Sequence, residues 1–310
     1  MQARHIVVAG LLTFTTACGV GVETLAGEGL EASLEGEDGL SATSQSYVTL
    51  RPDLRKCMSP LCGGYYVADV NRVTLNEKYV SGLDFSLANL SPDDEDAVRS
   101  APTGELLLRG KLGPLEAQFK TRQFRVTEAY RGMPGVQNAA GESFFRAQDR
   151  VPAINCFAAP CNNEVATRLN YAPTTSFTRL SVDRAALALV DKDWLARRVL
   201  AHGALVAGKF VNGAVFGAGP EKVLDASQVY LRVPDFAGPC PAVRLAQCPP
   251  GSTWTYTRSA DRCLIPVGCV PQGICPLYVP SCAPGYQLAS WRAAPSACAR
   301  FACDPGFVAN

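Results

Sequence analysis

Histidine is nearly missing from this sequence: only His5 and His202 occur among 310 residues. Histidine is the commonest metal ligand and general base, so the count excludes a His-rich metal centre and leaves little room for histidine catalysis. His202 precedes Gly203, a pair typical of a helix end, where a histidine compensates the helix dipole. We expect no catalytic residue, no metal and no cofactor.

An excess of basic charge is also lacking. The 29 Lys and Arg residues are balanced by 28 Asp and Glu residues, for a formal net charge of +1. Because electrostatic binding of nucleic acid needs a basic field, we expect no nucleic-acid partner. No C-x2-C pair occurs either, which excludes a zinc ribbon.

Long apolar runs are absent after residue 17, so no later segment predicts a transmembrane helix. Residues 1–17 instead have the features of a signal peptide: a short basic start, an apolar stretch over 6–14 and small residues at its end. Thr15-Thr16-Ala17-Cys18 resembles a bacterial lipobox, although Thr15 stands where that pattern has Leu. Cys18 is therefore the predicted lipidation site, which would anchor the exported chain to the cell envelope, at the outer membrane. The alternative is a secreted protein with Cys18 free.

The cysteine count supports a lipid on Cys18. Thirteen cysteines are odd for an exported protein. Without Cys18, the remaining cysteines can all pair as disulfides in an oxidising compartment: Cys57, Cys62, Cys156, Cys161, Cys240, Cys248, Cys263, Cys269, Cys275, Cys282, Cys298 and Cys303. Residues 18–46 carry acidic but no basic residues and little bulky apolar content, which predicts a flexible tether after the lipidated cysteine.

An internal repeat organises the middle of the chain. Cys57 and Cys62 form a C-x4-C pair that recurs as Cys156 and Cys161, 99 residues later. Residues 107–111 match 205–209, and residues 124–130 match 224–230, at nearly the same spacing. Several landmarks in one order predict two copies of a domain, at residues 47–138 and 139–238.

Each copy is expected to be mainly β, with one short helix per repeat, although an α+β fold is an alternative. Val126, Glu128 and Tyr130 are expected on one face of a strand, and glycines 110 and 208 are each expected to mark a bulge or a bend. Ser91-Pro92 followed by four acidic residues predicts the start of the first helix. In the second copy, residues 185–190 and 194–195 predict a helix. Each C-x4-C pair is expected to bridge a tight turn, and the alternatives are a redox dithiol or half of a zinc site.

The first copy resembles an uncharacterised domain of predicted myxobacterial lipoproteins. The resemblance rests on Arg51-x-Asp53-x-Arg55-Lys56-Cys57-x-Ser59-Pro60-Leu61-Cys62-Gly63-Gly64-Tyr65 and on the later segments 79–85 and 126–131. The second copy departs from it, since Asn162-Asn163 replace Gly-Gly and the Arg-Lys pair is lost. The family has no assigned activity, so the resemblance implies a location and a domain type. Arg51, Arg55 and Lys56 are candidate binding residues in this motif.

The tail, residues 239–310, contains a second repeat. Its eight cysteines recur at offsets of 34 or 35 residues, which predicts two modules at 239–273 and 274–310. Modules this small need disulfides to fold, and the sequence leaves three pairings open for each. Trp254 and Trp291 occupy matching places in the modules and are candidates for contact with an extracellular protein or glycan. The alternative, and the commoner role of such residues, is packing against a disulfide.

Three functions are compatible with these patterns. The first is a surface-anchored binding or structural lipoprotein, whose partners are the membrane and an extracellular protein or glycan. The second is a protease inhibitor, acting through a loop between Cys248 and Cys263 or between Cys282 and Cys298. The third is a hydrolase that uses carboxylates such as Asp53, Asp69 or Asp84. The lack of a catalytic constellation favours the first, so we do not expect an enzyme.

Overall fold

The computed structural model describes residues 44–72, 77–153, 156–217, 219–235, 240–259 and 261–308. The predicted signal peptide, Cys18 and almost all of the predicted tether lie outside these residues. The described chain is mainly β, as expected, and contains disulfide-stapled modules. Neither α-helix has the length and apolar character needed to cross a bilayer.

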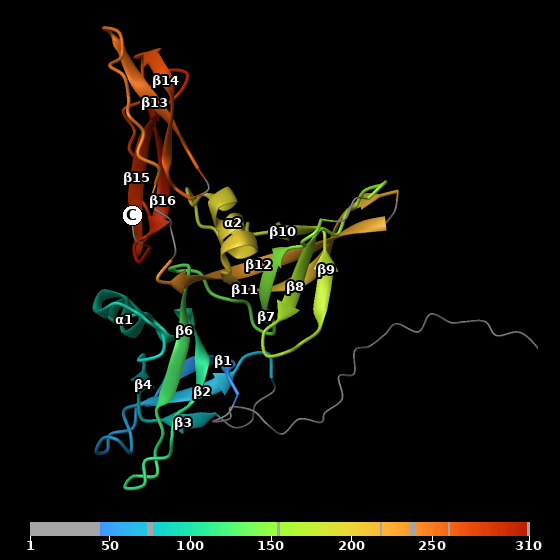
Figure 1. Ribbon diagram of the computed structural model, residues 1–310, viewed down its shortest axis with the longest axis vertical. Helices are drawn as coiled ribbons and strands as arrows, with labels where there is room; N and C mark the ends of the chain where they lie inside the picture. Colours follow the sequence, from blue (N-terminus) through green and yellow to red (C-terminus); the bar gives the residue numbers. More distant parts are fainter. Residues whose placement is uncertain are drawn as a thin grey trace, which may run out of the picture. The chain divides into compact units, whose positions relative to one another are not determined.

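The first half of the fold contains six strands and one α-helix, together with a 3-10 turn at Thr103–Glu105. In chain order these are β1 (Ser46–Pro52), β2 (Tyr65–Asp69), β3 (Lys78–Val80), β4 (Leu83–Asp84), α1 (Pro92–Arg99), β5 (Leu106–Leu112) and β6 (Phe124–Gly132). The second half repeats this order as β7 (Ser143–Asp149), β8 (Glu164–Arg168), β9 (Thr174–Phe177), β10 (Arg179–Ser181), α2 (Lys192–His202), β11 (Leu205–Phe216) and β12 (Gly219–Val233). The same sequence of elements therefore occurs twice (Figure 1).

Both halves contribute to one sheet, with the order β3-β2-β1-β5-β6-β12-β11-β7-β8-β9. The halves join where β6 pairs antiparallel with β12, with Tyr130 opposite Arg232. The two short strands off this path occupy equivalent places, because β4 pairs parallel with β6 and β10 pairs parallel with β12. The two copies are thus halves of a single sheet.

The predicted glycine bulges are confirmed. The register shifts between Arg109 and Gly110 in β5, and between Ala207 and Gly208 in β11. At Gly110 a Cβ atom would lie 2.1 Å from the carbonyl oxygen of Arg125, so only glycine fits beside that backbone.

The expected faces of β6 are wrong because of this bulge. The extra residue in β6 is Thr127, so the strict alternation of side chains breaks there. Val126 and Ala129 pack in the core of the first half, whereas Tyr130 packs in a central cluster between the halves. Val126 and Tyr130 therefore do not share a face.

Helix α1 begins as predicted. Ser91 is its N-cap, its side chain accepts the backbone N–H of Asp94, and the Asp94 carboxylate accepts the N–H of Ser91 in return. Helix α2 begins later than predicted. Leu189 has a φ of 68°, which interrupts a right-handed helix, and the N-cap is Asp191, which accepts the N–H of Trp194. The predicted end at His202 is confirmed, with Gly203 left-handed at a φ of 72°.

Two asparagines join the halves, and we call them the asparagine clasp. Asn71 donates to the carbonyls of Phe144 and Leu169 and accepts the N–H of Phe144 at 2.7 Å. Asn170 makes the reciprocal bonds: it donates to the carbonyls of Tyr47 and Val70 and accepts the N–H of Tyr47 at 2.8 Å. Both residues have left-handed backbones, which asparagine tolerates better than most residues.

The apolar core has three parts. One cluster packs beneath each helix, around Val98 in the first half and Trp194 in the second. The third, central cluster takes equivalent residues from both halves, including the pairs Leu107 with Leu205 and Tyr130 with Tyr230. Since neither half contains this cluster alone, burial of its apolar surface favours association of the two halves.

The tail forms two disulfide-stapled hairpins, β13 (Ser252–Arg258) with β14 (Leu264–Pro271), and β15 (Tyr286–Ala293) with β16 (Cys298–Pro305). The structure resolves the pairing that the sequence left open. In each module the first cysteine pairs with the third and the second with the fourth, as Cys240–Cys263, Cys248–Cys269, Cys275–Cys298 and Cys282–Cys303. The two C-x4-C pairs are bridged as predicted, Cys57 to Cys62 and Cys156 to Cys161.

The tail contacts the second half through an ion pair of the buried Arg198 with Asp261, whose side chain is 46% exposed, while Asp235, the other partner of Arg198, belongs to the second half itself. Arg198 of α2 lies 3.4 Å from Asp235 and 3.8 Å from Asp261 of the first tail hairpin. The second hairpin joins the network through Asp304, which pairs with Arg258. Because buried charges are costly unless they are paired, these contacts make a specific connection between helix and tail.

Candidate functional site

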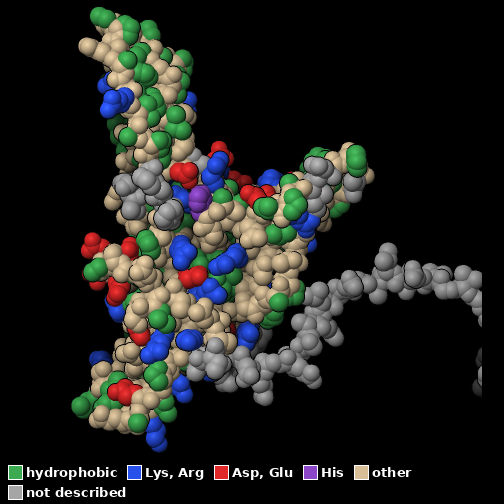
Figure 2. Space-filling model, in the orientation of Figure 1, with side chains coloured by type: hydrophobic (Ala, Val, Ile, Leu, Met, Phe, Trp, Pro, Cys, Tyr) green, Lys and Arg blue, Asp and Glu red, His purple; other side chains and the backbone are tan. Residues whose placement is uncertain are grey.

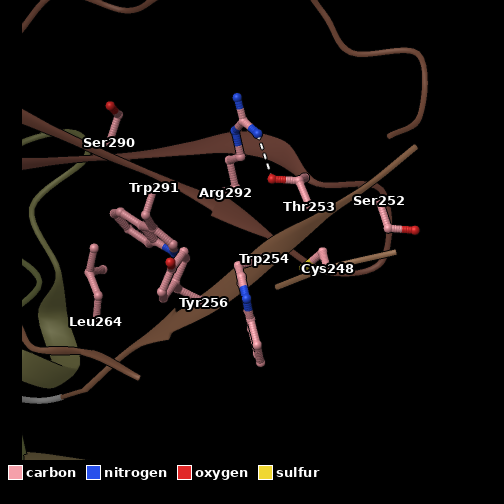
Figure 3. A pocket seen from close by; sticks show the side chains of 9 residues that line it. All are labelled: Cys248, Ser252, Thr253, Trp254, Tyr256, Leu264, Ser290, Trp291 and Arg292. Atoms are coloured by element: carbon pink, nitrogen blue, oxygen red, sulfur yellow. Dashed lines mark hydrogen bonds between the residues drawn. The ribbon is translucent and has the colours of Figure 1, made fainter. Parts of the chain in front are cut away.

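A groove lies between the two tail hairpins, and we call it the tail groove. It has a volume of about 540 Å³. Strand β13 contributes Thr253, Trp254 and Tyr256, and strand β15 contributes Trp291 and Arg292. The lining is completed by Cys248, Ser252, Leu264 and Ser290 (Figure 3). The two tryptophans singled out in the sequence therefore line the same groove, although 37 residues separate them.

Polar contacts hold the sides of the tail groove. The indole N–H of Trp254 donates to the carbonyl of Ala246 at 2.7 Å. Arg292 donates to the hydroxyl of Thr253 at 2.7 Å, which ties one hairpin to the other across the groove (Figure 3). The guanidinium of Arg258 lies 5.5 Å from the centre of the Trp291 ring, within the range of a cation–π contact. The aromatic walls are thus positioned before any ligand binds.

Apolar side chains continue beyond the groove. Leu264, Ile265 and Val267 of β14 are each more than two fifths exposed. In the segment between the hairpins, Leu277 is fully exposed. Figure 2 shows hydrophobic side chains over much of the visible face of the tail. Extended exposed apolar surface in a folded protein commonly marks a site of interaction.

The motif of the first half is built differently. Arg51 pairs with Glu77 and lies over the Tyr66 ring, 4.4 Å from its centre. Arg55 pairs with Asp53 at 2.9 Å. Hydrogen bonds from Arg55 hold the pKa of the Asp53 carboxyl below its ordinary value. Both arginines thus support the fold of this motif through partners inside the chain.

Lys56 is the remaining candidate in this motif. Its side chain is exposed and makes no ion pair within the described part of the chain. The structure therefore brings Arg51 and Arg55 together around Tyr66, and it leaves Lys56 at the surface.

The comparisons with known proteins bear on residues 46–236. This segment matches the family model described as a domain of unknown function, DUF6748. The chain belongs to the DUF6748 family. The DUF6748 domain spans both halves of the sheet, from β1 to the end of β12, so one family unit contains both sequence repeats.

A relative extends the comparison beyond this domain. The chain is 27% identical over 261 residues to an uncharacterised protein of Dictyostelium discoideum, with 82% of this chain and 84% of the relative covered. The aligned length exceeds that of the DUF6748 domain, so the similarity continues outside it. No solved structure matches the chain.

The candidate residues divide at the edge of the DUF6748 domain. Arg51, Arg55 and Lys56 lie inside it, whereas Trp254 and Trp291 lie in the tail beyond it. Sequence reasoning missed Arg292, Thr253 and Leu264 of the tail groove. Cysteine spacing does not show which residues of the two hairpins face each other. The only signal for the groove in the sequence was that Trp254 and Trp291 occupy matching places in the two modules. Within the described residues, no cluster of three or more His, Cys, Asp or Glu side chains fits a metal ion.

Proposed function

We propose that this chain is a lipid-anchored binding protein of a bacterial cell envelope, and that the tail groove is its binding surface. Cys18 carries the lipid at the outer membrane, and residues 18–46 form the tether that displays the DUF6748 domain and the tail. The single observation that supports the binding role is that Trp254, Tyr256 and Trp291 line one groove. This proposal includes the domain boundaries that the sequence predicts, at residues 47–138, 139–238, 239–273 and 274–310.

A glycan is the ligand class that the tail groove fits best. Its aromatic rings offer apolar faces, and Ser252, Ser290 and Arg292 place hydroxyl and guanidinium groups beside them. Binding sites with these properties combine an apolar wall with a few polar groups that orient the ligand. An extracellular protein is the alternative partner, and the exposed apolar side chains of β14 would suit it.

Binding can be tested on the full chain by calorimetry with soluble oligosaccharides of glucose, N-acetylglucosamine and uronic acids. We expect at least one class to bind, and Trp254→Ala or Trp291→Ala to weaken that binding by about tenfold or more. Leu288→Ala is the matched control, because Leu288 is exposed on β15 but does not line the groove. If no oligosaccharide binds, or if both tryptophan variants bind as the parent does, the glycan proposal fails.

The anchor requires a separate test. Intact-mass analysis of the membrane fraction should show a diacylglycerol adduct that Cys18→Ala lacks. Mature protein found only in the medium, with Cys18 unmodified, would contradict the anchor and leave the groove proposal standing. The inhibitor and hydrolase hypotheses stay predictions. For the hydrolase, Asp53 and Asp84 already pair with Arg55 and Arg125.

A further inference from the structure

A second hollow lies in the DUF6748 domain, and we call it the basic pocket. It is formed between β3 and the loop that joins β5 to β6, and its volume is about 450 Å³. The lining residues are Lys78, Tyr79, Leu112, Leu115, Lys120, Thr121 and Arg122. Three of these side chains are cationic, and none is acidic.

Two cations of the basic pocket, Lys120 and Arg122, make no ion pair within the described residues. Arg122 uses one guanidinium nitrogen to donate to the Gly113 carbonyl at 2.9 Å, which leaves other donors of its fork for a ligand. Thr121 of the lining contacts an acidic side chain, because its hydroxyl donates to the Glu116 carboxylate at 3.2 Å. Lys120 and Arg122 therefore bring positive charge to the pocket that no ion pair within the described residues neutralises.

The walls of the basic pocket are held in place. The Tyr79 hydroxyl donates to the Pro60 carbonyl at 2.8 Å. Lys120 has a φ of 53°, and its N–H donates to the Glu116 carbonyl in the turn that Glu116 and Thr121 close. Leu115 adds an apolar wall that is 53% exposed. A bound oxyanion would meet positioned donors with an apolar flank beside them.

The second half lacks this arrangement. The sheet register makes Lys78 equivalent to Thr175 and Tyr79 equivalent to Ser176. In the matching loop, Pro220 and Glu221 stand at the places of Lys120 and Thr121, and Lys222 alone keeps the charge of Arg122. The basic pocket is therefore a property of the first half, and the shared scaffold does not require it.

We propose that the basic pocket binds a phosphate group carried by a partly apolar ligand. Lysine and arginine donors with a hydroxyl are the groups that recognise a phosphate oxyanion. The charges of Lys120 and Arg122 match a doubly charged phosphate better than a singly charged carboxylate. Leu112 and Leu115 would contact the apolar part of the ligand. Both a phospholipid headgroup and a free phosphate ester have this chemistry. The proposal is independent of the tail groove and of the lipid on Cys18.

Two sets of probes distinguish a phospholipid headgroup from a free phosphate ester. Both are used on the full chain with Cys18→Ala, so that no attached lipid contributes to binding. Inorganic pyrophosphate and glycerol 3-phosphate are titrated by calorimetry. Vesicles of phosphatidylcholine, with and without phosphatidic acid, are tested by co-sedimentation. We expect binding to at least one phosphate probe, weakened by added salt. Binding to the phosphatidic acid vesicles alone assigns a lipid headgroup, and binding to the soluble probes assigns a free phosphate ester.

The variants decide whether the pocket is responsible. Lys120→Asn removes an exposed charge and suits the left-handed backbone, and Arg122→Gln removes the second charge. We expect the double variant to bind at least about tenfold more weakly, through the loss of charge-assisted hydrogen bonds. Lys222→Gln, the equivalent change in the second half, should leave binding unaltered. If the double variant loses its fold, Lys120→Asn alone replaces it. The absence of binding to every probe, or equal binding by Lys120→Asn and the parent, would overturn the proposal.

Discussion

The two halves of the DUF6748 domain share a scaffold but differ at equivalent positions. Ser91 and Asp191 cap their helices in the same way, so Val98 of α1 and Arg198 of α2 lie the same number of residues beyond the cap. Val98 is fully buried, and Arg198 is only 1% exposed. The first helix thus buries an apolar side chain where the second buries a charge.

The neighbours of the helices explain this difference. Arg198 has Asp235 and Asp261 beside it, and both belong to segments that connect the sheet to the tail or lie in the tail. Val98 packs in the apolar cluster of the first half, which Val233 of β12 also joins. A buried arginine is stable only where acidic partners compensate its charge. The tail and the segment leading to it supply such partners beside the second helix, so a buried arginine is tolerated there.

The largest effect is expected when the second helix is made to resemble the first. Arg198→Val should destabilise the protein by about 3–5 kcal/mol, because it removes the ion-pair partner of the buried Asp235. Urea denaturation followed by circular dichroism measures the loss. The control Arg99→Ala should cost less than about 1 kcal/mol, since the Arg99–Glu95 pair is solvent-exposed. An unchanged midpoint for Arg198→Val would show that the buried network does not hold the tail.

The asparagine clasp should respond equally in both halves. Asn71→Ala and Asn170→Ala each remove three hydrogen bonds and leave a left-handed alanine, for an expected loss of about 3 kcal/mol. Asn89→Ala is the control, because Asn89 has a φ of 52° but its side chain makes no hydrogen bond to another described residue. This control measures how much of the lost stability comes from placing alanine in a left-handed backbone, about 1 kcal/mol. If the two variants lost clearly different amounts of stability, Asn71 and Asn170 would not be equivalent in joining the halves.

The smallest effect concerns Glu164 in β8, which stands where β2 has Tyr65. Burial, together with the nearby charge of Asp149, raises the pKa of Glu164 to about 7 from an ordinary 4.5. Between these values the folded chain keeps a proton that the unfolded chain releases, so stability should fall as the pH rises through this window. Glu164→Gln should flatten that decline.

Urea midpoints measured from pH 4 to pH 8 test the Glu164 prediction. The difference between the variant and the parent isolates this carboxyl from the other titrating groups. Asp149→Asn serves as a comparison, because it removes a charge that raises the same pKa and should narrow the window. A parent and a Glu164→Gln variant with parallel pH profiles would contradict the assignment.

Much of the fold could be read from local sequence. The C-x4-C bridges, the bulges at Gly110 and Gly208 and the capping of α1 all depend on residues close together in the chain. The start of α2 was misplaced because Ala185–Val190 have helical composition, while the backbone at Leu189 and the cap at Asp191 place the helix later. The predicted faces of β6 are wrong because the extra residue of the bulge at Gly110 is Thr127 of the partner strand, and the glycine by itself does not show which strand carries the extra residue.

The candidate sites depended more on tertiary structure. The sequence by itself determined the β-rich class, the repeated pattern and the cysteine sets, since these follow from spacing, turn chemistry and side-chain type along the chain. Only the tertiary structure decided that both halves share one sheet, that Trp254 and Trp291 line one groove and that three cations surround one pocket. The physical reason is register: strand pairing and buried ion pairs bring together residues whose proximity no local pattern encodes.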